Sequence, residues 1–143
     1  MSAQTVRDAM VPEPTTLGAG ESAQQAGRFL ADPQVRAIFV TEDDGRLLGV
    51  VTRKTLVREV VAAGLDPKAV PLRDVAEPPY HTLDADLELE AAFRFLEERD
   101  LERVPVVGPD GRLAGVLSRA VVQRRLAEDE PPADDDDETL SAV

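Results

Sequence analysis

The chain has 143 residues, of which 43% are hydrophobic and only 3% aromatic, so a core must be built from aliphatic side chains. It contains no cysteine, which excludes disulfides, thiolate metal sites and a cysteine nucleophile. The net charge of −12, with no basic stripe to offset it, argues against nucleic acid as a partner.

The first half of the chain predicts two helices that flank a pair of strands. A short strand is expected near Thr16 and Leu17. Apolar spacing, β-branched runs and the turn signal Asp43-Asp44-Gly45 then predict a helix over residues 21–32, strands over 37–41 and 47–51, and a closing helix over 54–63. Gly64 is placed to end that helix, and two prolines follow it in the connector.

The second half predicts the same series of elements. A short strand is expected near Thr82 and Leu83. The elements that follow are a helix over residues 86–100, strands over 103–107 and 113–117 around the turn signal Pro109-Asp110-Gly111, and a helix over 121–127.

The two halves are related by a constant offset of 66 residues. The ten residues 44–53 (DGRLLGVVTR) return as 110–119 (DGRLAGVLSR), and residues 6–8 (VRD) return as 72–74 (LRD). No gap is needed between the matches, and a period of this length indicates two copies of one supersecondary unit. We therefore expect a first repeat over 1–65, a connector over 66–71 and a second repeat over 72–127.

A unit of this size buries too little apolar surface to be secure alone. We therefore expect an α+β protein in which the two sheets pack against each other around a pseudo-twofold axis. Residues 128–143 carry eight acidic residues and no basic ones, which predicts a disordered, solubilising tail. Weak divalent-cation binding and competition for a basic surface are alternative roles for this tail.

No run approaches the 18 apolar residues that a membrane span needs, and residues 1–10 lack the apolar core of a signal peptide. We therefore expect a cytoplasmic protein without membrane insertion.

The repeated segments resemble the CBS domain family, named for the regulatory region of cystathionine β-synthase. The resemblance covers roughly residues 5–127 and rests on four segments in order: VRDAM at 6–10, GVVT at 49–52, RVPVV with DG at 103–111, and GVLS at 115–118. The layout also resembles the small stand-alone CBS pairs of actinobacteria. The resemblance implies a β-α-β-β-α fold in each copy, two clefts between the copies and a homodimer.

The resemblance also implies a regulatory role with an adenosine-containing ligand in the clefts, such as AMP, ADP, ATP or S-adenosylmethionine. In the family's nucleotide signature a hydroxyl residue is followed three positions later by an aspartate that accepts hydrogen bonds from the ribose. The pairs Thr52-Arg53 and Ser118-Arg119 match its first part, whereas Thr55 and Val121 replace the aspartates. We therefore expect weak or altered binding in the first copy and none of the usual mode in the second.

Most of these residues have a structural interpretation beside the functional one. Ile38 and Val104 stand where the family places apolar groups against adenine, although sheet core is the more common role of such residues. Thr52 and Ser118 could cap helices as well as meet a phosphate, since both roles use the same geometry. Arg53 and Arg119 are either cleft residues or surface charges.

His81 is the sole histidine and belongs to a segment that borders a cleft in the family. Without a cysteine, a second histidine or a clustered carboxylate nearby, we expect it to have no catalytic role. Tyr80 beside it could stack on a base, although packing at the junction of the repeats is the simpler role.

Two functions follow from the sequence. The first is a ligand-sensing regulatory module that requires no cofactor. The second is an interaction scaffold with closed clefts, which would bind a protein partner or a second copy of the chain. An enzyme is not expected, because the sequence contains no nucleophile elbow, phosphate-cradling glycine loop or ligand-spaced histidines.

Overall fold

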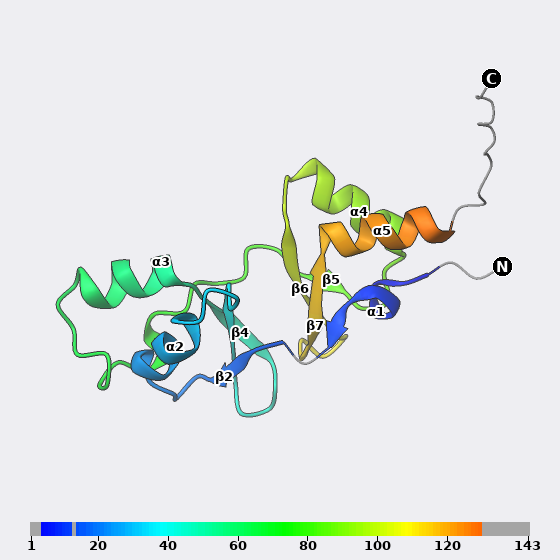
Figure 1. Cartoon of the computed structure of the whole chain (residues 1–143). Helices are drawn as coiled ribbons and strands as arrows, with labels where there is room; N and C mark the ends of the chain where they lie inside the picture. The colour runs from blue at the N-terminus through cyan, green and yellow to red at the C-terminus, as the bar shows by residue number, and fades with distance from the viewer. Residues whose placement is uncertain (1–3, 13, 130–143) are drawn as a thin grey trace, which may run out of the picture.

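The computed structural model describes residues 4–12 and 14–129 and shows two α+β repeats that lie side by side (Figure 1). The first repeat contains β2 (Thr16–Gly18), α2 (Ala23–Leu30), β3 (Ile38–Thr41), β4 (Leu47–Val51), α3 (Arg53–Leu56) and the π-helix η1 (Val57–Val61). The second contains β5 (Leu83–Asp84), α4 (Leu89–Glu98), β6 (Arg103–Val107), β7 (Leu113–Ser118) and α5 (Arg119–Asp129). The predicted tail lies outside the described residues from position 130 onward.

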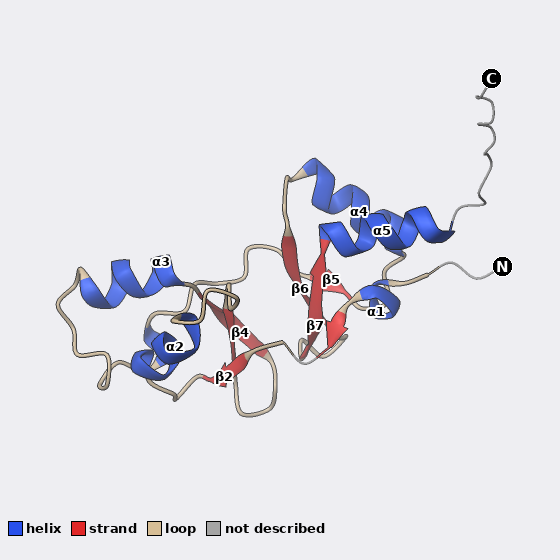
Figure 2. Cartoon of the chain, in the orientation of Figure 1, coloured by secondary structure: helices blue, strands red, loops and turns tan. Residues whose placement is uncertain are grey.

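Each repeat has the predicted order of strand, helix, two strands and helix (Figure 2). In the first sheet, β2 runs parallel to β3, which pairs antiparallel with β4. In the second, β5, β6 and β7 follow the same pattern, and the turns at Gly45 and Gly111 adopt the positive φ angles that glycine allows. The fold prediction is therefore confirmed.

The helices differ in detail from the prediction: α4 is shorter than residues 86–100, and α5 is longer than residues 121–127. Helix α2 is shorter than residues 21–32, because the Ser22 hydroxyl accepts a hydrogen bond from the Gln25 amide and so fixes its start. The closing helix of the first repeat starts as α3 and continues as the π-helix η1. None of the helices in the described part of the chain has the length and apolar character needed to cross a membrane.

The segment that leads into each repeat packs on the other repeat, an exchange that the sequence did not predict. Helix α1 (Val6–Ala9) and strand β1 (Val11–Pro12) precede the first repeat, yet β1 pairs with β7, and Val6 is buried in the core of the second repeat. The 3-10 helix η2 (Leu72–Asp74) precedes the second repeat, yet Leu72 is buried in the core of the first. We call residues 5–12 and 71–78 the leading segments. Each core is therefore completed by the leading segment of the other repeat.

The repeated glycines 49 and 115 make room for these segments. Glu77 and Val50 exchange two backbone hydrogen bonds of 2.8 and 2.9 Å, so the second leading segment crosses β4 at close range. A Cβ atom on Gly49 would lie 2.5 Å from the Glu77 carbonyl oxygen, and one on Gly115 would lie 2.6 Å from that of Val11. A side chain at either position would therefore push the leading segment away from the strand.

The two hairpin turns also join the repeats, through a symmetric pair of contacts. The Leu47 amide donates to the Gly111 carbonyl and the Leu113 amide to the Gly45 carbonyl, both at 3.1 Å. Shifting both partners by 66 residues turns each of these bonds into the other. The same shift turns the contact of Gly49 with Glu77 into that of Gly115 with Val11. Such reciprocal contacts are the signature of a pseudo-twofold axis between the repeats.

We predict that Gly49→Ala lowers the free energy of unfolding by about 1–3 kcal/mol, the usual cost of overpacking. The new methyl group would meet backbone atoms of Glu77, which cannot rotate away as a flexible side chain could. Chemical denaturation measures the effect. Gly18→Ala is the control, because its Cβ would lie 4.0 Å from the nearest neighbour. Equal stability of the two variants would contradict the close approach.

A cleft between the two repeats

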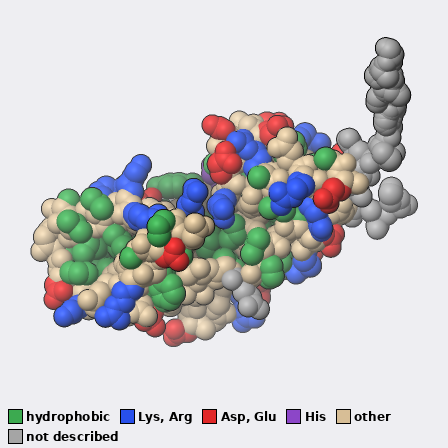
Figure 3. Space-filling view, viewed as in Figure 1, with side chains coloured by type: hydrophobic (Ala, Val, Ile, Leu, Met, Phe, Trp, Pro, Cys, Tyr) green, Lys and Arg blue, Asp and Glu red, His purple; other side chains and the backbone are tan. Residues whose placement is uncertain are grey.

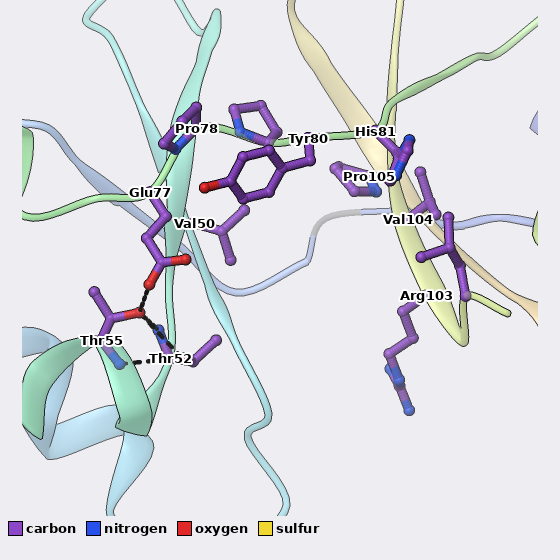
Figure 4. Close-up of a pocket in the computed structure, with 12 residues that line it drawn as sticks. Val50, Thr52, Thr55, Glu77, Pro78, Tyr80, His81, Arg103, Val104 and Pro105 are labelled. Carbon is purple, nitrogen blue, oxygen red and sulfur yellow. Dashed lines mark hydrogen bonds between the residues drawn. The ribbon is translucent and has the colours of Figure 1, made fainter. Parts of the chain in front are cut away.

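An open cleft of about 230 Å³ lies between β4 of the first repeat and β6 of the second (Figure 4). Its walls come from three parts of the chain: the end of β4 with the start of α3, the junction over residues 77–81, and β6 with the loop before it. The lining residues are Val50, Thr52, Thr55, Glu77, Pro78, Pro79, Tyr80, His81, Leu101, Arg103, Val104 and Pro105. The cleft is mostly apolar, with charged groups on two sides, as is common for small-molecule sites.

Two threonines at the start of α3 form a hydrogen-bonded cap. The Thr52 hydroxyl accepts from the Thr55 amide at 3.3 Å, and the Thr55 hydroxyl accepts from the Thr52 amide at 3.1 Å. Their hydroxyl oxygens lie 3.0 Å apart. The predicted capping role of Thr52 is thus confirmed, whereas its contact with a ligand stays a prediction. At Ser118 the hydroxyl accepts more loosely from the Val121 amide, at 3.4 Å.

Thr55 is fully enclosed, with 1% of its surface exposed, and its hydroxyl donates to Oε2 of Glu77 at 3.0 Å. The expectation that Thr55 offers an acceptor to a ligand is therefore not favoured by this geometry. The single hydroxyl proton goes to Glu77, and the oxygen already accepts from the Thr52 amide. The acceptor that faces the cleft is the carboxylate of Glu77.

Glu77 is held by contacts from the first repeat. Besides Thr55, the Arg58 guanidinium donates to the same oxygen, Oε2, while the backbone of Glu77 is fixed on Val50. The hydrogen bond from Arg58 is the main cause that lowers the pKa of Glu77 below its usual value, and the bond from Thr55 adds to it. Glu77 is therefore ionised at neutral pH and can only accept hydrogen bonds.

The rest of the cleft is built from rings and aliphatic groups. The Tyr80 side chain projects between Glu77 and His81 in Figure 4 and is 78% exposed, so a broad apolar surface faces solvent. The His81 ring packs edge-on against Phe95, with centroids 5.6 Å apart, while its contact with a ligand stays a prediction. Arg103 lies on the wall opposite Glu77 and brings a positive charge.

The structure brings together Thr52, Thr55, His81 and Val104 of the predicted site residues, but it leaves four others outside this cleft. Ile38, Arg53, Ser118 and Arg119 are not among its lining residues. Ile38 is fully buried in the core of the first repeat. Val104 is buried in the second core and also lines the cleft.

Both arginines hold the loop that precedes a central strand. Arg53 donates to the carbonyl oxygens of Asp32 and Val35 at 2.9 and 2.7 Å. Arg119 forms ion pairs with Asp100 and Glu102 at 3.3 and 2.6 Å. These contacts give both guanidinium groups a structural role beside β3 and β6.

The offset of 66 residues relates this cleft to a second set of residues with different chemistry. Val50 corresponds to Val116, and the position of Glu77 corresponds to Val11, which pairs with Val116 across β1 and β7. Ser118 corresponds to Thr52, but Val121 takes the place of Thr55. The polar pair of threonine and glutamate in this cleft is thus replaced by two valines at the equivalent positions.

Sequence reasoning missed Glu77. The available signal was its offset partner, Val11, because a charged residue at one of two equivalent positions marks a difference between the repeats. No group of three or more histidine, cysteine, aspartate or glutamate side chains within residues 4–12 and 14–129 is arranged to hold a metal ion.

Comparison with known proteins identifies both repeats as CBS domains. The family model described as CBS domain matches residues 6–62 and 72–128. The chain is 31% identical over 124 residues to hypoxic response protein 1 of Mycobacterium tuberculosis, and the match covers 87% of this chain and 86% of that protein. It is also 27% identical over 109 residues to inosine-5′-monophosphate dehydrogenase of the same species, but there the match covers only 20% of the relative.

Solved structures of CBS-pair proteins share the fold of this chain. A crystal structure of hypoxic response protein I with two coordinated zinc ions matches with a TM-score of 0.72 and 30% identity, covering 85% of this chain and 98% of that one. CBSX2 in complex with AMP, a CBS-pair protein from Arabidopsis thaliana, matches with a TM-score of 0.69 and 28% identity, covering 87% and 96%. The cytosolic domain of the Mg²⁺ channel MgtE in complex with ATP shares the fold, with a TM-score of 0.65 and 24% identity, over 82% of this chain and 46% of that one.

We predict that Glu77→Gln lowers the melting temperature at neutral pH and that the difference from the unsubstituted protein shrinks as the solution is acidified. The folded state depresses the pKa of this carboxyl, so its stabilisation is present above the ordinary value of 4.5 and is lost as pH falls through the lower, folded value. Melting curves from pH 7 to pH 3 test this. Glu59→Gln is the control, because Glu59 pairs with the same arginine outside the cleft. A constant difference at all pH values would contradict the assigned charge.

Proposed function

The chain belongs to the CBS domain family, and from that premise we propose that it is a non-enzymatic regulatory module that binds an adenine nucleotide in the cleft beside Glu77. The observation that carries the proposal is the cleft itself, with an ionised carboxylate on one wall, an arginine on the other and an exposed tyrosine between them. A nucleoside phosphate has a matching group for each: ribose hydroxyls that donate to the carboxylate, a phosphate that pairs with the arginine and a flat base that stacks on the tyrosine.

The similarity to solved structures supports the choice of ligand. CBSX2, which was solved with AMP, is 28% identical to this chain over nearly its whole length. The MgtE domain solved with ATP adds only the shared fold, because its identity is 24%. The cleft volume of about 230 Å³ is below the range of about 300–1,000 Å³ for drug-sized molecules, so part of a bound nucleotide would extend out of this open cleft.

The chemistry of the two clefts supports one bound nucleotide per chain. In the first cleft, the paired Thr55 and Glu77 supply a hydrogen-bond acceptor. In the second, Val121 and Val11 supply none. A ligand hydroxyl group that leaves water without finding a hydrogen-bond acceptor in the protein weakens binding by about 1–3 kcal/mol. The second cleft is therefore the weaker site for the same nucleotide.

We predict that AMP, ADP, ATP or S-adenosylmethionine raises the melting temperature, with about 2.7 kcal/mol of added stability when the ligand is present at 100 times its Kd. Titration calorimetry with the most effective compound should give a stoichiometry near one per chain. A stoichiometry near two would contradict the assigned difference between the clefts. The absence of any shift at millimolar concentration would overturn nucleotide binding and favour the alternative, an interaction scaffold.

We also propose that the chain forms a homodimer through the closing helix of its first repeat. Val57 and Val61 of η1 are 57% and 70% exposed, and Leu65, which lies just beyond this helix, is 49% exposed. Figure 3 shows hydrophobic surface over the helices of this repeat. Exposed apolar groups that gather in this way are typical of protein interfaces. The equivalent positions Gln123 and Ala127 of the second repeat carry no large apolar group.

We predict that Val61→Asp shifts the protein from dimer to monomer at micromolar concentration, because a charge would be buried in the interface without a partner. Light scattering coupled to size-exclusion chromatography measures the mass. Val11→Asp is the matched control, since Val11 is also exposed, at 53%, but lies on β1 away from this helix. An unchanged dimer in Val61→Asp, or a monomeric unsubstituted chain, would overturn this interface.

A further inference from the structure

We propose that the Glu77 carboxylate, rather than the side chain at position 55, binds the ribose hydroxyl groups of the nucleotide. The inference rests on the proposed function and names the residue that gives the site its preference for a ribose. It also assigns a role to a residue outside the repeated motif, because Glu77 belongs to the leading segment of the second repeat and not to β4 or α3.

The first step is that the Thr55 hydroxyl is already engaged in hydrogen bonds within the protein. Thr55 has 1% of its surface exposed, and its one hydroxyl proton is directed to Glu77. Its oxygen accepts from the Thr52 amide and lies 3.0 Å from the Thr52 hydroxyl. Thr55 therefore acts as a bridge that ties the cap of α3 to the carboxylate.

The second step is that one carboxylate oxygen of Glu77, Oε1, is available to a ligand. Both side-chain donors, Thr55 and Arg58, bond to Oε2, and among the described residues Oε1 has no hydrogen-bond partner. Figure 4 shows this second oxygen on the side of the carboxylate that points away from Thr55 and toward the space between Glu77 and Val50. An ionised carboxylate accepts hydrogen bonds and repels phosphate, so the end of the ligand that it selects is the end that carries hydroxyl groups.

The third step is that this oxygen is held in place before a ligand arrives. The backbone of Glu77 is fixed by its two hydrogen bonds to Val50, and Gly49 allows that approach. Thr55 and Arg58 fix the side chain. A preorganised acceptor costs less conformational entropy on binding than a free surface carboxylate, whose side chain would have to be ordered.

The experiment compares a ribonucleotide with its deoxy forms. The adenine nucleotide that binds most tightly in the calorimetric panel is titrated beside its 2′-deoxy and 3′-deoxy analogues. The unsubstituted protein should bind the ribonucleotide about 10- to 100-fold more tightly than at least one analogue, as expected for a hydrogen bond to a charged group. In Glu77→Gln the ratio should fall to about threefold or less.

Two controls make the result specific. Glu59→Gln removes the other carboxylate that pairs with Arg58 but leaves the cleft intact, so it should keep the ratio of the unsubstituted protein. Melting curves without ligand confirm that each variant is folded. If the nucleotide binds and Glu77→Gln keeps the full ratio, the role of Glu77 is overturned while the proposed function stands. If no nucleotide of the panel binds the unsubstituted protein, both fall.

Discussion

The exchange of leading segments between the repeats is the constraint on which the rest of the structure depends. Neither half contains its whole core: Val6 completes the second and Leu72 completes the first. A leading segment that crosses to the other repeat must lie against the edge of that repeat's sheet. The strand residues at the two crossings are Gly49 and Gly115, which have no side chain to block the approach. The same crossing brings Glu77 to the end of β4, so the packing of the fold also positions the charge of the cleft.

A pseudo-twofold backbone does not require two equivalent sites. The reciprocal contacts of the hairpin turns and leading segments constrain main-chain atoms and glycines, which both repeats share. Side chains at the cleft are under no such constraint. The first cleft combines Thr55 with Glu77, and the second combines Val121 with Val11. Thr55 and Glu77 come from different repeats and are joined by a hydrogen bond, whereas both equivalent positions are apolar.

The order of the elements could be predicted from the sequence, because strand runs, helical spacing and the turns at Gly45 and Gly111 are local signals that occur twice. The capping role of Thr52 could be predicted for the same reason. The exchange could not, since residues 6–10 carry no local sign of which core they will join. The cleft was predicted only in part: Thr52, Thr55, His81 and Val104 line it, but Glu77 was missed and Arg53 and Arg119 hold loops instead. These differences all come from long-range contacts.

The threonine at position 55 is better explained as a partner of Glu77 than as a lost aspartate. Thr55 Oγ1 lies 3.0 Å from Glu77 Oε2, so a carboxylate at position 55 would place two negative charges at nearly this separation. Two carboxylates so close cannot both stay ionised, and one pKa would rise strongly. A hydroxyl at this position instead donates to Glu77 and, together with Arg58, favours its charged form. The pair of Thr55 and Glu77 thus keeps a single negative charge at the end of β4, where an aspartate at position 55 would add a second.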